Sequence, residues 1–321
     1  MNKSAQIFFI ASLLLFQGYC SKLIGQQDPQ YSQYMFNQLV INPAYAGSKE
    51  ALSSVIDLRK QWIAMPGAPQ TGTFGIHGPM AFKSLGIGGH IIAEAIGPSQ
   101  WTGAYTDFAY RFRLGKGKLS LGIAAGVVNY NLNLSASDYK DPGETYPSQN
   151  MGPKTKFDAT AGFYYYTSSF YMGGSITHLT NPNLYYGSMV NAPTLTHKGD
   201  TSTINFNLAP HVFLYMGKSW LINDNLVINP SIMYRAVGMI QNIDFNCNFL
   251  IKQRVWAGLS LRSGYGMVYL IQYMINDQFR VGYSFDQGFN RIGIYGKSSQ
   301  EIMLGYNFNI RKSKMVSPRF M

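Results

Sequence analysis

Residues 278–286 read QFRVGYSFD, and their side chains alternate between apolar and polar. Phe279, Val281, Tyr283 and Phe285 fall on one face of an extended chain, and the residues between them are polar or glycine. Successive side chains of a β-strand point to opposite faces, so this stretch predicts a strand with one apolar face. Strands of this kind form membrane barrels, in which one face meets lipid and the other meets a polar lumen.

The same alternation recurs in TDFAYRFR (106–113), NIDFNCNF (242–249) and EIMLGYNF (301–308). Turn signals divide the rest of the chain into further extended segments. The predicted strands are 51–63, 70–78, 84–97, 99–113, 117–134, 156–166, 168–178, 203–216, 225–238, 242–251, 254–264, 266–275, 277–286 and 299–308. Most reach the roughly nine residues that a tilted strand needs to cross a bilayer.

We therefore predict an all-β fold, a transmembrane antiparallel β-barrel of about fourteen strands. Composition agrees, because only 13% of the 321 residues are charged while 15% are aromatic, and 33 are glycine. No segment after the amino terminus has the ~18 consecutive apolar residues of a membrane helix, which leaves a closed barrel as the spanning structure. A soluble β-sandwich or propeller is the alternative, but it would not need strands this long or so many aromatic residues.

The lengths of the connections predict the orientation. The three longest, 135–155, 179–202 and 287–298, all follow odd-numbered strands, whereas the connections after even-numbered strands are mostly short. In outer-membrane barrels the long loops are external and the short turns are periplasmic. Both ends of the barrel sequence are therefore expected on the periplasmic side.

Four regions are expected along the chain. Residues 1–25 resemble a signal peptide, with Lys3 before a short apolar run and cleavage expected after Gly25. Residues 26–50 form a non-strand segment, 51–308 the barrel and 309–321 a short basic tail. Cys20 raises a lipoprotein alternative, which the bulky Tyr19 before it disfavours. The predicted location is the outer membrane.

The formal charge of +11 has no concentrated patch outside the tail, so we expect contact with anionic lipid and an arginine-containing lumen rather than nucleic acid. Polar-face charges are expected to pair inside the lumen or to tune what passes through it. These candidate lumen charges are Asp107, Arg111, Arg235, Arg262, Arg280, Asp286 and Glu301.

Catalytic chemistry finds no support in the sequence. The five histidines are isolated, none has the spacing of metal ligands, and no nucleophile motif is present. We expect no enzyme activity, no catalytic residues, no metal and no cofactor.

The segment 26–50 has no strand or helix period, and it is rich in Gln, Asn and Tyr. A lumen of fourteen strands is too wide for wall side chains alone to fill, so this segment is expected either to plug it or to bind a periplasmic partner. The residues of this candidate motif are Asp28, Pro29, Tyr31, Tyr34, Phe36, Asn37, Asn42, Pro43, Tyr45 and Gly47. At the other end, Tyr306 and Phe308 suit an assembly signal. The tail residues Pro318, Arg319 and Phe320 suit a free end or a periplasmic docking peptide.

Residues 27–48, QDPQYSQYMFNQLVINPAYAGS, resemble the start of the mature PorP/SprF family of type IX secretion system membrane proteins. RKQWIAMPGAPQTGTFGIHGPM (59–80) resembles a family block at Arg59, Gln61, Trp62, Gly67 and Pro69, and later blocks extend the resemblance to the closing SPRFM. Two positions depart from the family pattern. Met321 follows Phe320 at the end, and Gln300 stands where the family often has His.

The resemblance implies a non-enzymatic outer-membrane barrel of the type IX secretion and gliding machinery of Bacteroidetes. It implies secretion or surface anchoring of partner proteins such as adhesins, and contact with periplasmic ring and peptidoglycan-linked components. The sequence alone leaves a porin or small-molecule transporter as the alternative function.

Overall fold

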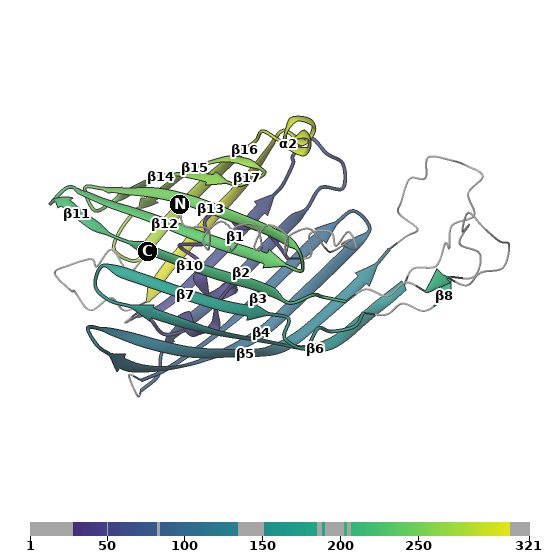
Figure 1. Cartoon of the computed structure of the whole chain (residues 1–321), viewed down its shortest axis with the longest axis horizontal. Coiled ribbons are helices and arrows are strands. Elements are labelled where there is room, and N and C mark those ends of the chain that lie inside the picture. The colour runs from purple at the N-terminus through teal and green to yellow at the C-terminus, as the bar shows by residue number, and fades with distance from the viewer. Residues whose placement is uncertain are drawn as a thin grey trace, which may run out of the picture.

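The protein is described here by a computed structural model that covers residues 28–49, 51–81, 84–133, 151–184, 188–189, 202–203 and 207–308. Its main sheet is antiparallel and closes on itself into a barrel of fourteen strands (Figure 1). The barrel strands are β1 (Leu52–Lys60), β2 (Gln70–Pro79), β3 (Leu85–Ile96), β4 (Ser99–Leu114), β5 (Gly117–Leu132), β6 (Met151–Tyr166), β7 (Phe170–Thr177), β10 (His211–Lys218), β12 (Leu226–Val237), β13 (Ile240–Ile251), β14 (Val255–Arg262), β15 (Gly266–Met274), β16 (Phe279–Gly288) and β17 (Ser298–Phe308).

Each barrel strand pairs with its neighbours in chain order, and the first strand pairs with the last. The β1–β17 register runs from Leu52 opposite Phe308 to Lys60 opposite Gln300. The predicted fold class and strand number are therefore confirmed. Each of the fourteen barrel strands is paired on both sides, as a lipid environment requires.

Several predicted boundaries were wrong. The strand expected at 203–216 begins only at His211, because Pro210 has no N–H to donate to the ladder and β9 (Ser202–Thr203) pairs with β8 (Ser188–Met189) instead. The strand expected from 156 already starts at Met151.

The connection 217–224 is more than a turn, since it includes a short strand, β11 (Trp220–Asn223). β11 pairs with β12 and is not one of the fourteen strands of the barrel. The first strand, expected to reach residue 63, ends at Lys60, because Trp62 adopts a positive φ of 43° that breaks the extended chain.

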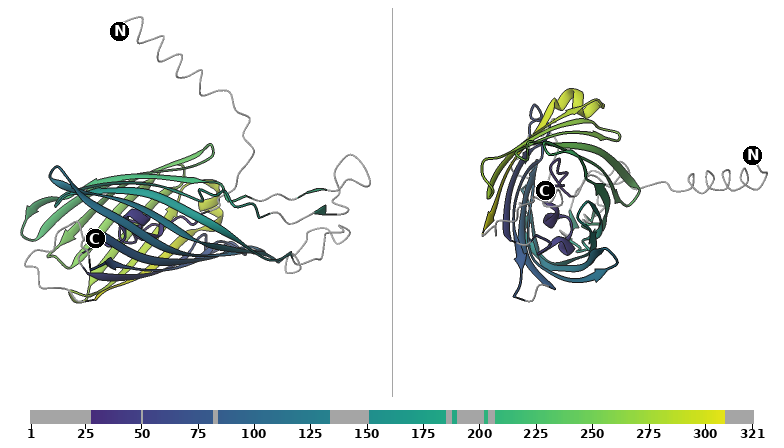
Figure 2. Two further views of the ribbon diagram at one scale, coloured as in Figure 1. Left: turned by 90° about the horizontal axis from the view of Figure 1, so that it is seen from below. Right: turned by 90° about the vertical axis from the view of Figure 1, so that its left-hand side faces the viewer.

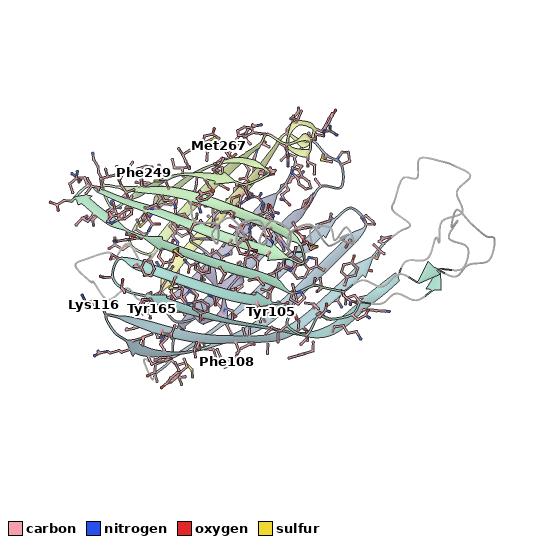
Figure 3. All side chains as sticks on the ribbon, in the orientation of Figure 1. Tyr105, Phe108, Lys116, Tyr165, Phe249 and Met267 are labelled. Carbon is pink, nitrogen blue, oxygen red and sulfur yellow. The ribbon has the colours of Figure 1, made fainter. Side chains whose placement is uncertain are left out.

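The two faces of the wall differ as the alternation predicts. On β4, Phe108 and Tyr110 are 47% and 55% exposed on the outer face, while Asp107 on the inner face is buried. Side chains such as Phe108 project outward from the wall in Figure 3. On β16, Arg280 and Asp286 point inward and are buried. The outward band is apolar, and the inward face carries the charges.

Helical structure is sparse. The β16–β17 connection contains α2 (Arg291–Gly296), whose first turn is capped by the Asn290 side chain accepting from the Gly293 N–H. The segment before β1 contains two short 3-10 helices, η1 (Gln38–Val40) and η2 (Pro43–Tyr45). No helix in the described part of the chain is long and apolar enough to cross a membrane.

Candidate functional site: the lumen segment and its binding surface

Residues 28–49, called here the lumen segment, lie inside the barrel. Every residue of the segment except Asp28 and Gln30 is buried. The view along the barrel in Figure 2 shows the segment enclosed by the wall, with its short helices in the interior. The largest apolar cluster of the protein joins this segment to inward-facing wall residues, so the core of the molecule is the filled lumen.

The segment spans the lumen from one end to the other. Asp28 contacts His178, which directly follows β7 at the end where the long connections lie. Gly47 donates its N–H to His77 Nδ1 at 3.1 Å, near the other end of the wall, where β2 finishes. With the long loops external, Asp28 lies at the external end and Gly47 at the periplasmic end.

The segment is held in the external half by the Arg59 network, which consists of Arg59, Arg262, Asp286 and Glu301. Arg59 pairs with Asp286 at 2.6 Å and with Glu301 at 3.0 Å, and all three side chains are almost completely buried. Glu301 accepts the N–H groups of Ser32 and Gln33 at 2.8 and 2.7 Å.

Ser32 completes the Arg59 network from the segment side. Its hydroxyl lies 2.8 Å from Asp286 Oδ2 and accepts from Arg59 Nη1 at 2.9 Å. Charge-assisted hydrogen bonds of this kind are about twice as strong as neutral ones, and burial keeps water from competing for them. The network therefore binds the segment backbone through a carboxylate, Glu301, that also pairs with Arg59.

Lumen arginines also donate to carbonyl groups of the segment. Arg262 Nη2 donates to the Tyr31 carbonyl at 3.2 Å, and its Nε lies 3.2 Å from Asp244 Oδ2. Arg235 pairs with the same carboxylate at 3.1 Å. Arg280 Nη2 donates to the Phe36 carbonyl at 3.2 Å. An irregular backbone inside a barrel needs such donors, because it lacks a ladder of its own.

The middle of the segment is fixed by amide and aromatic side chains. Asn42 Nδ2 donates to the Phe163 carbonyl at 2.9 Å, and its Oδ1 caps η2 by accepting the Ala44 N–H at 3.0 Å. Tyr34 accepts from Asn246 Nδ2 at 2.5 Å. Three further contacts join the segment to the wall: Asn37 to Thr73, Phe36 edge-on to Trp256, and Tyr45 edge-on to Tyr164.

Two wall glycines allow the segment to approach closely at the periplasmic end. A Cβ atom on Gly122 would lie 2.2 Å from the Ala44 nitrogen, and one on Gly86 would lie 2.2 Å from the Ala46 carbonyl oxygen. Gly47 itself has a φ of +66°, a conformation that favours glycine. The backbones of the wall and the segment therefore pack directly against each other at these two positions, and a side chain on either wall glycine would prevent it.

Cations gather around this end of the segment. Arg111 Nη1 donates to the Ala46 carbonyl at 3.1 Å. Burial, together with the nearby Arg280, lowers the pKa of Lys49 well below its usual value. Removing Lys49 from the lumen would relieve that burial, so its charge works against the packed state.

A second polar cluster holds the external end of the segment. His178 Nε2 lies 2.8 Å from Asp28 Oδ1, and His178 Nδ1 lies 2.5 Å from Asp158 Oδ2. His211 Nδ1 lies 3.5 Å from Asp28 Oδ2. Although burial alone lowers it, the pKa of His178 is raised to about 10 by Asp28 and Asp158. Burial acts to raise the pKa of Asp28, but His178 and His211 hold it below its usual value.

Arg59 of the family block lies near the end of β1 and faces the lumen, whereas the other four residues of the block lie in the external β1–β2 loop. Gln61 donates its N–H to the Pro69 carbonyl at 2.9 Å, and Trp62 donates its N–H to Ser299 Oγ at 3.1 Å. Gly67 has a φ of +70° and its carbonyl accepts from Gly97. The block thus positions Arg59 by closing the loop next to the start of β17.

Other predicted residues lie apart from the segment. Asp107 pairs with His90 at 2.8 Å within the wall. Tyr306 and Phe308 contact each other edge-on at the periplasmic end of β17. Pro318, Arg319 and Phe320 lie outside the described residues, as do residues 1–25 with the expected cleavage site.

Sequence reasoning missed several contacts of the segment. Ser32, Gln33 and Asp158 were not singled out, His178 was considered only as one of the five isolated histidines, and Arg59 was selected only through the family block. Asp244 was visible as an inward position of its strand, and the same alternation marks Asp158. No sequence signal connects His178 with Asp28, because they are distant in the chain and meet only across the lumen.

Solved structures with a similar fold include two proteins described as toluene transporters. The toluene transporter TbuX of Ralstonia pickettii has a TM-score of 0.53 and 10% identity, with 85% of this chain and 94% of that chain covered. The Pseudomonas putida toluene transporter TodX has a TM-score of 0.47 and 10% identity, covering 88% and 95%. A Pseudomonas aeruginosa FadL homologue has a TM-score of 0.47 and 11% identity, covering 89% and 96%. No curated protein matches the sequence significantly.

The closed barrel, the apolar outer band and the occupied lumen define an outer-membrane β-barrel whose interior is filled by its own amino-terminal segment. The sequence match assigns the family. The chain belongs to the type IX secretion system membrane proteins PorP/SprF, which it matches over residues 23–306. Family membership places it in the outer membrane and associates it with the type IX secretion machinery.

Proposed function

We propose that this barrel is a non-enzymatic component of the type IX secretion and gliding machinery that supports secretion or surface anchoring of partner proteins such as adhesins. In this proposal the chain is cleaved after Gly25. The external loops face the secreted partner, and the basic tail 309–321 faces periplasmic ring and peptidoglycan-linked components.

The observation that supports this proposal is the filled lumen. The segment is bound to several strands around the wall through buried hydrogen bonds, such as those with Glu301, Arg280 and Tyr215. A porin or small-molecule transporter needs a continuous path, and the lumen segment lies across it. A plugged barrel suits an anchor, because its rigid core holds the loops in fixed positions while preventing leakage.

The test is secretion of a surface adhesin by cells that carry variants of this protein. Removing residues 28–47 should leave a barrel that inserts into the outer membrane but should abolish surface display of the adhesin. Glu301→Gln should reduce display, because it weakens the hold on Ser32 and Gln33. Glu94→Gln is the matched control, since among the described residues this buried glutamate accepts hydrogen bonds from Thr71 and Trp101 of the wall rather than from the segment.

Normal display by the deletion variant would contradict the proposed role of the segment. Co-purification identifies the partners independently: the wild-type barrel should carry type IX secretion components with it. Recovery of the barrel alone, together with steady transport of a small solute by purified protein, would favour the transporter.

A further inference from the structure

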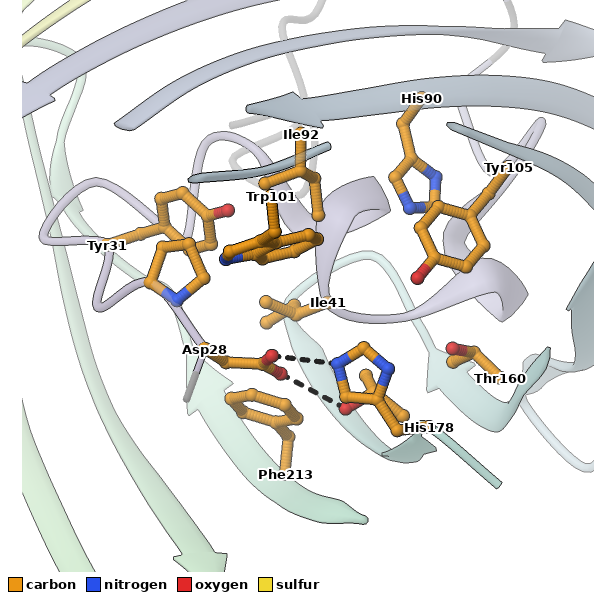
Figure 4. Close-up of a pocket in the computed structure, with 12 residues that line it drawn as sticks. Asp28, Tyr31, Ile41, His90, Ile92, Trp101, Tyr105, Thr160, His178 and Phe213 are labelled. Atoms are coloured by element: carbon orange, nitrogen blue, oxygen red, sulfur yellow. Dashed lines mark hydrogen bonds and ion pairs between the residues drawn. The ribbon is translucent and has the colours of Figure 1, made fainter. Parts of the chain in front are cut away.

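Two histidines and an aspartate meet where the amino end of the lumen segment reaches the wall. Asp28 comes from the segment, His178 directly follows β7, and His211 begins β10. One ligand atom from each of the three side chains lies within 4.8 Å of the others. Figure 4 shows the Asp28 carboxylate directed at the His178 ring beside Trp101 and Tyr105.

The chemistry of these side chains suits a divalent transition-metal ion. Imidazole nitrogen and carboxylate oxygen are the donors that Zn²⁺ takes at bond lengths of about 2.0–2.2 Å. Ligand atoms around a tetrahedral ion are then roughly 3.3 Å apart. Asp28 Oδ1 lies 2.8 Å from His178 Nε2, and one ligand atom from each of the three side chains lies within 4.8 Å of the others. His211 Nδ1 donates to the Ala209 carbonyl at 2.9 Å, so Nε2 is the His211 nitrogen that would bind the ion.

An outer layer of hydrogen bonds already orients the central ligand. Asp158 holds His178 Nδ1 at 2.5 Å, which directs Nε2 toward Asp28. Asp158 is itself fixed by the Tyr105 hydroxyl at 2.8 Å and the Thr180 hydroxyl at 3.0 Å. Metal-binding histidines usually have such a carboxylate on the second ring nitrogen, where it sets the tautomer and ring orientation.

The three ligands leave room for a fourth. Asp28 and His178 line a small cavity, which Tyr31, His90, Trp101 and Tyr105 also border (Figure 4). The cavity is large enough for a water molecule beside the ion. Three protein ligands leave one position of a tetrahedral ion to be completed by water.

We propose that Asp28, His178 and His211 bind a divalent transition-metal ion, with Zn²⁺ the best match, at the external end of the lumen. The ion joins the segment to β7 and β10, and thereby fixes the amino end of the segment to the wall. This inference is independent of any secreted partner, because it concerns only the segment and the barrel.

The test uses purified barrel in detergent, stripped with a chelator and titrated with Zn²⁺ alone. Wild-type protein should bind one ion per chain, and His211→Asn should weaken that binding at least tenfold. Asp158→Asn should weaken it by about 10–100-fold through loss of ligand orientation. His90→Asn is the matched control: it lines the same cavity and pairs with Asp107, and its affinity should equal that of wild type.

A second measurement keeps all three proposed ligands intact, so its result does not depend on whether a ligand variant folds. A cysteine placed at buried Val40 reports release of the segment through thiol labelling, and Zn²⁺ should slow this labelling while a chelator restores it. Two results would overturn the proposal. One is the absence of saturable Zn²⁺ binding by wild-type protein, and the other is equal binding by folded His211→Asn.

Discussion

Replacing Glu301 with Gln should release the lumen segment about a hundredfold more often than in the parent protein. The Glu301 carboxylate accepts the N–H groups of Ser32 and Gln33 at 2.8 and 2.7 Å and pairs with Arg59 at 3.0 Å. A Gln amide keeps one acceptor oxygen, which can serve only one of these two N–H groups. Its NH₂ group then faces the second N–H, and two donors cannot form a hydrogen bond. Arg59 keeps Asp286 at 2.6 Å, so only part of the network is lost.

The magnitude follows from these contacts. One buried N–H loses its charged acceptor, which costs roughly 1.5–3 kcal/mol. The other keeps a neutral acceptor in place of a charged one, at about half the strength. Together the loss is about 3 kcal/mol, and each 1.4 kcal/mol is about tenfold in population.

Thiol labelling measures this population. In a Cys247→Ser background, Val40→Cys places the reporter at a position that is 6% exposed in the wild-type protein. If the segment opens and closes faster than the thiol reacts, the labelling rate follows the released fraction. Glu94→Gln in the same background should label at the parent rate. A Glu301→Gln rate within about threefold of the parent would refute the role assigned to this carboxylate.

Two further variants probe the periplasmic half of the segment with the same reporter. Leaving the lumen raises the depressed pKa of Lys49, so this group makes release slower near pH ~9 than near pH ~7. Release also separates Asp28 from His178 and lowers the raised pKa of His178, which acts in the opposite direction. Lys49→Met should therefore raise the ratio of release at pH ~9 to release at pH ~7, once rates are corrected for thiol ionisation, and an unchanged ratio would contradict the role assigned to Lys49. Gly122→Ala puts a Cβ 2.2 Å from the Ala44 nitrogen and should raise labelling by about tenfold or more, whereas Gly72→Ala, which meets only the Leu58 side chain at 3.4 Å, should not.

The barrel could be predicted from the sequence because its pattern is local. Alternation of the kind seen in 278–286 fixes which side chains face lipid, and an even strand number with one-sided long loops fixes the topology. Strand ends were less predictable. Pro210 delays the start of β10, and the positive φ of Trp62 ends β1 early. Neither effect can be seen in the alternation of apolar and polar residues.

The site was only partly predictable, because its contacts are long-range. Alternation marked Asp286, Glu301, Arg262 and Arg280 as polar-face residues, and the structure places them in the lumen, but alternation gave no information on their partners. A segment without a period offers no register against the wall. Which of its carbonyls meets which arginine depends on the closed barrel, and that is set by pairings spread over the whole chain.

The central claim is that the lumen segment closes the barrel, and planar-bilayer conductance tests it most directly. Wild-type barrel inserted into the bilayer should be electrically silent at moderate voltage, and the variant lacking residues 28–47 should show steady open channels. Open channels of equal conductance from both proteins would contradict the account, because the segment would then not occupy the path through the lumen.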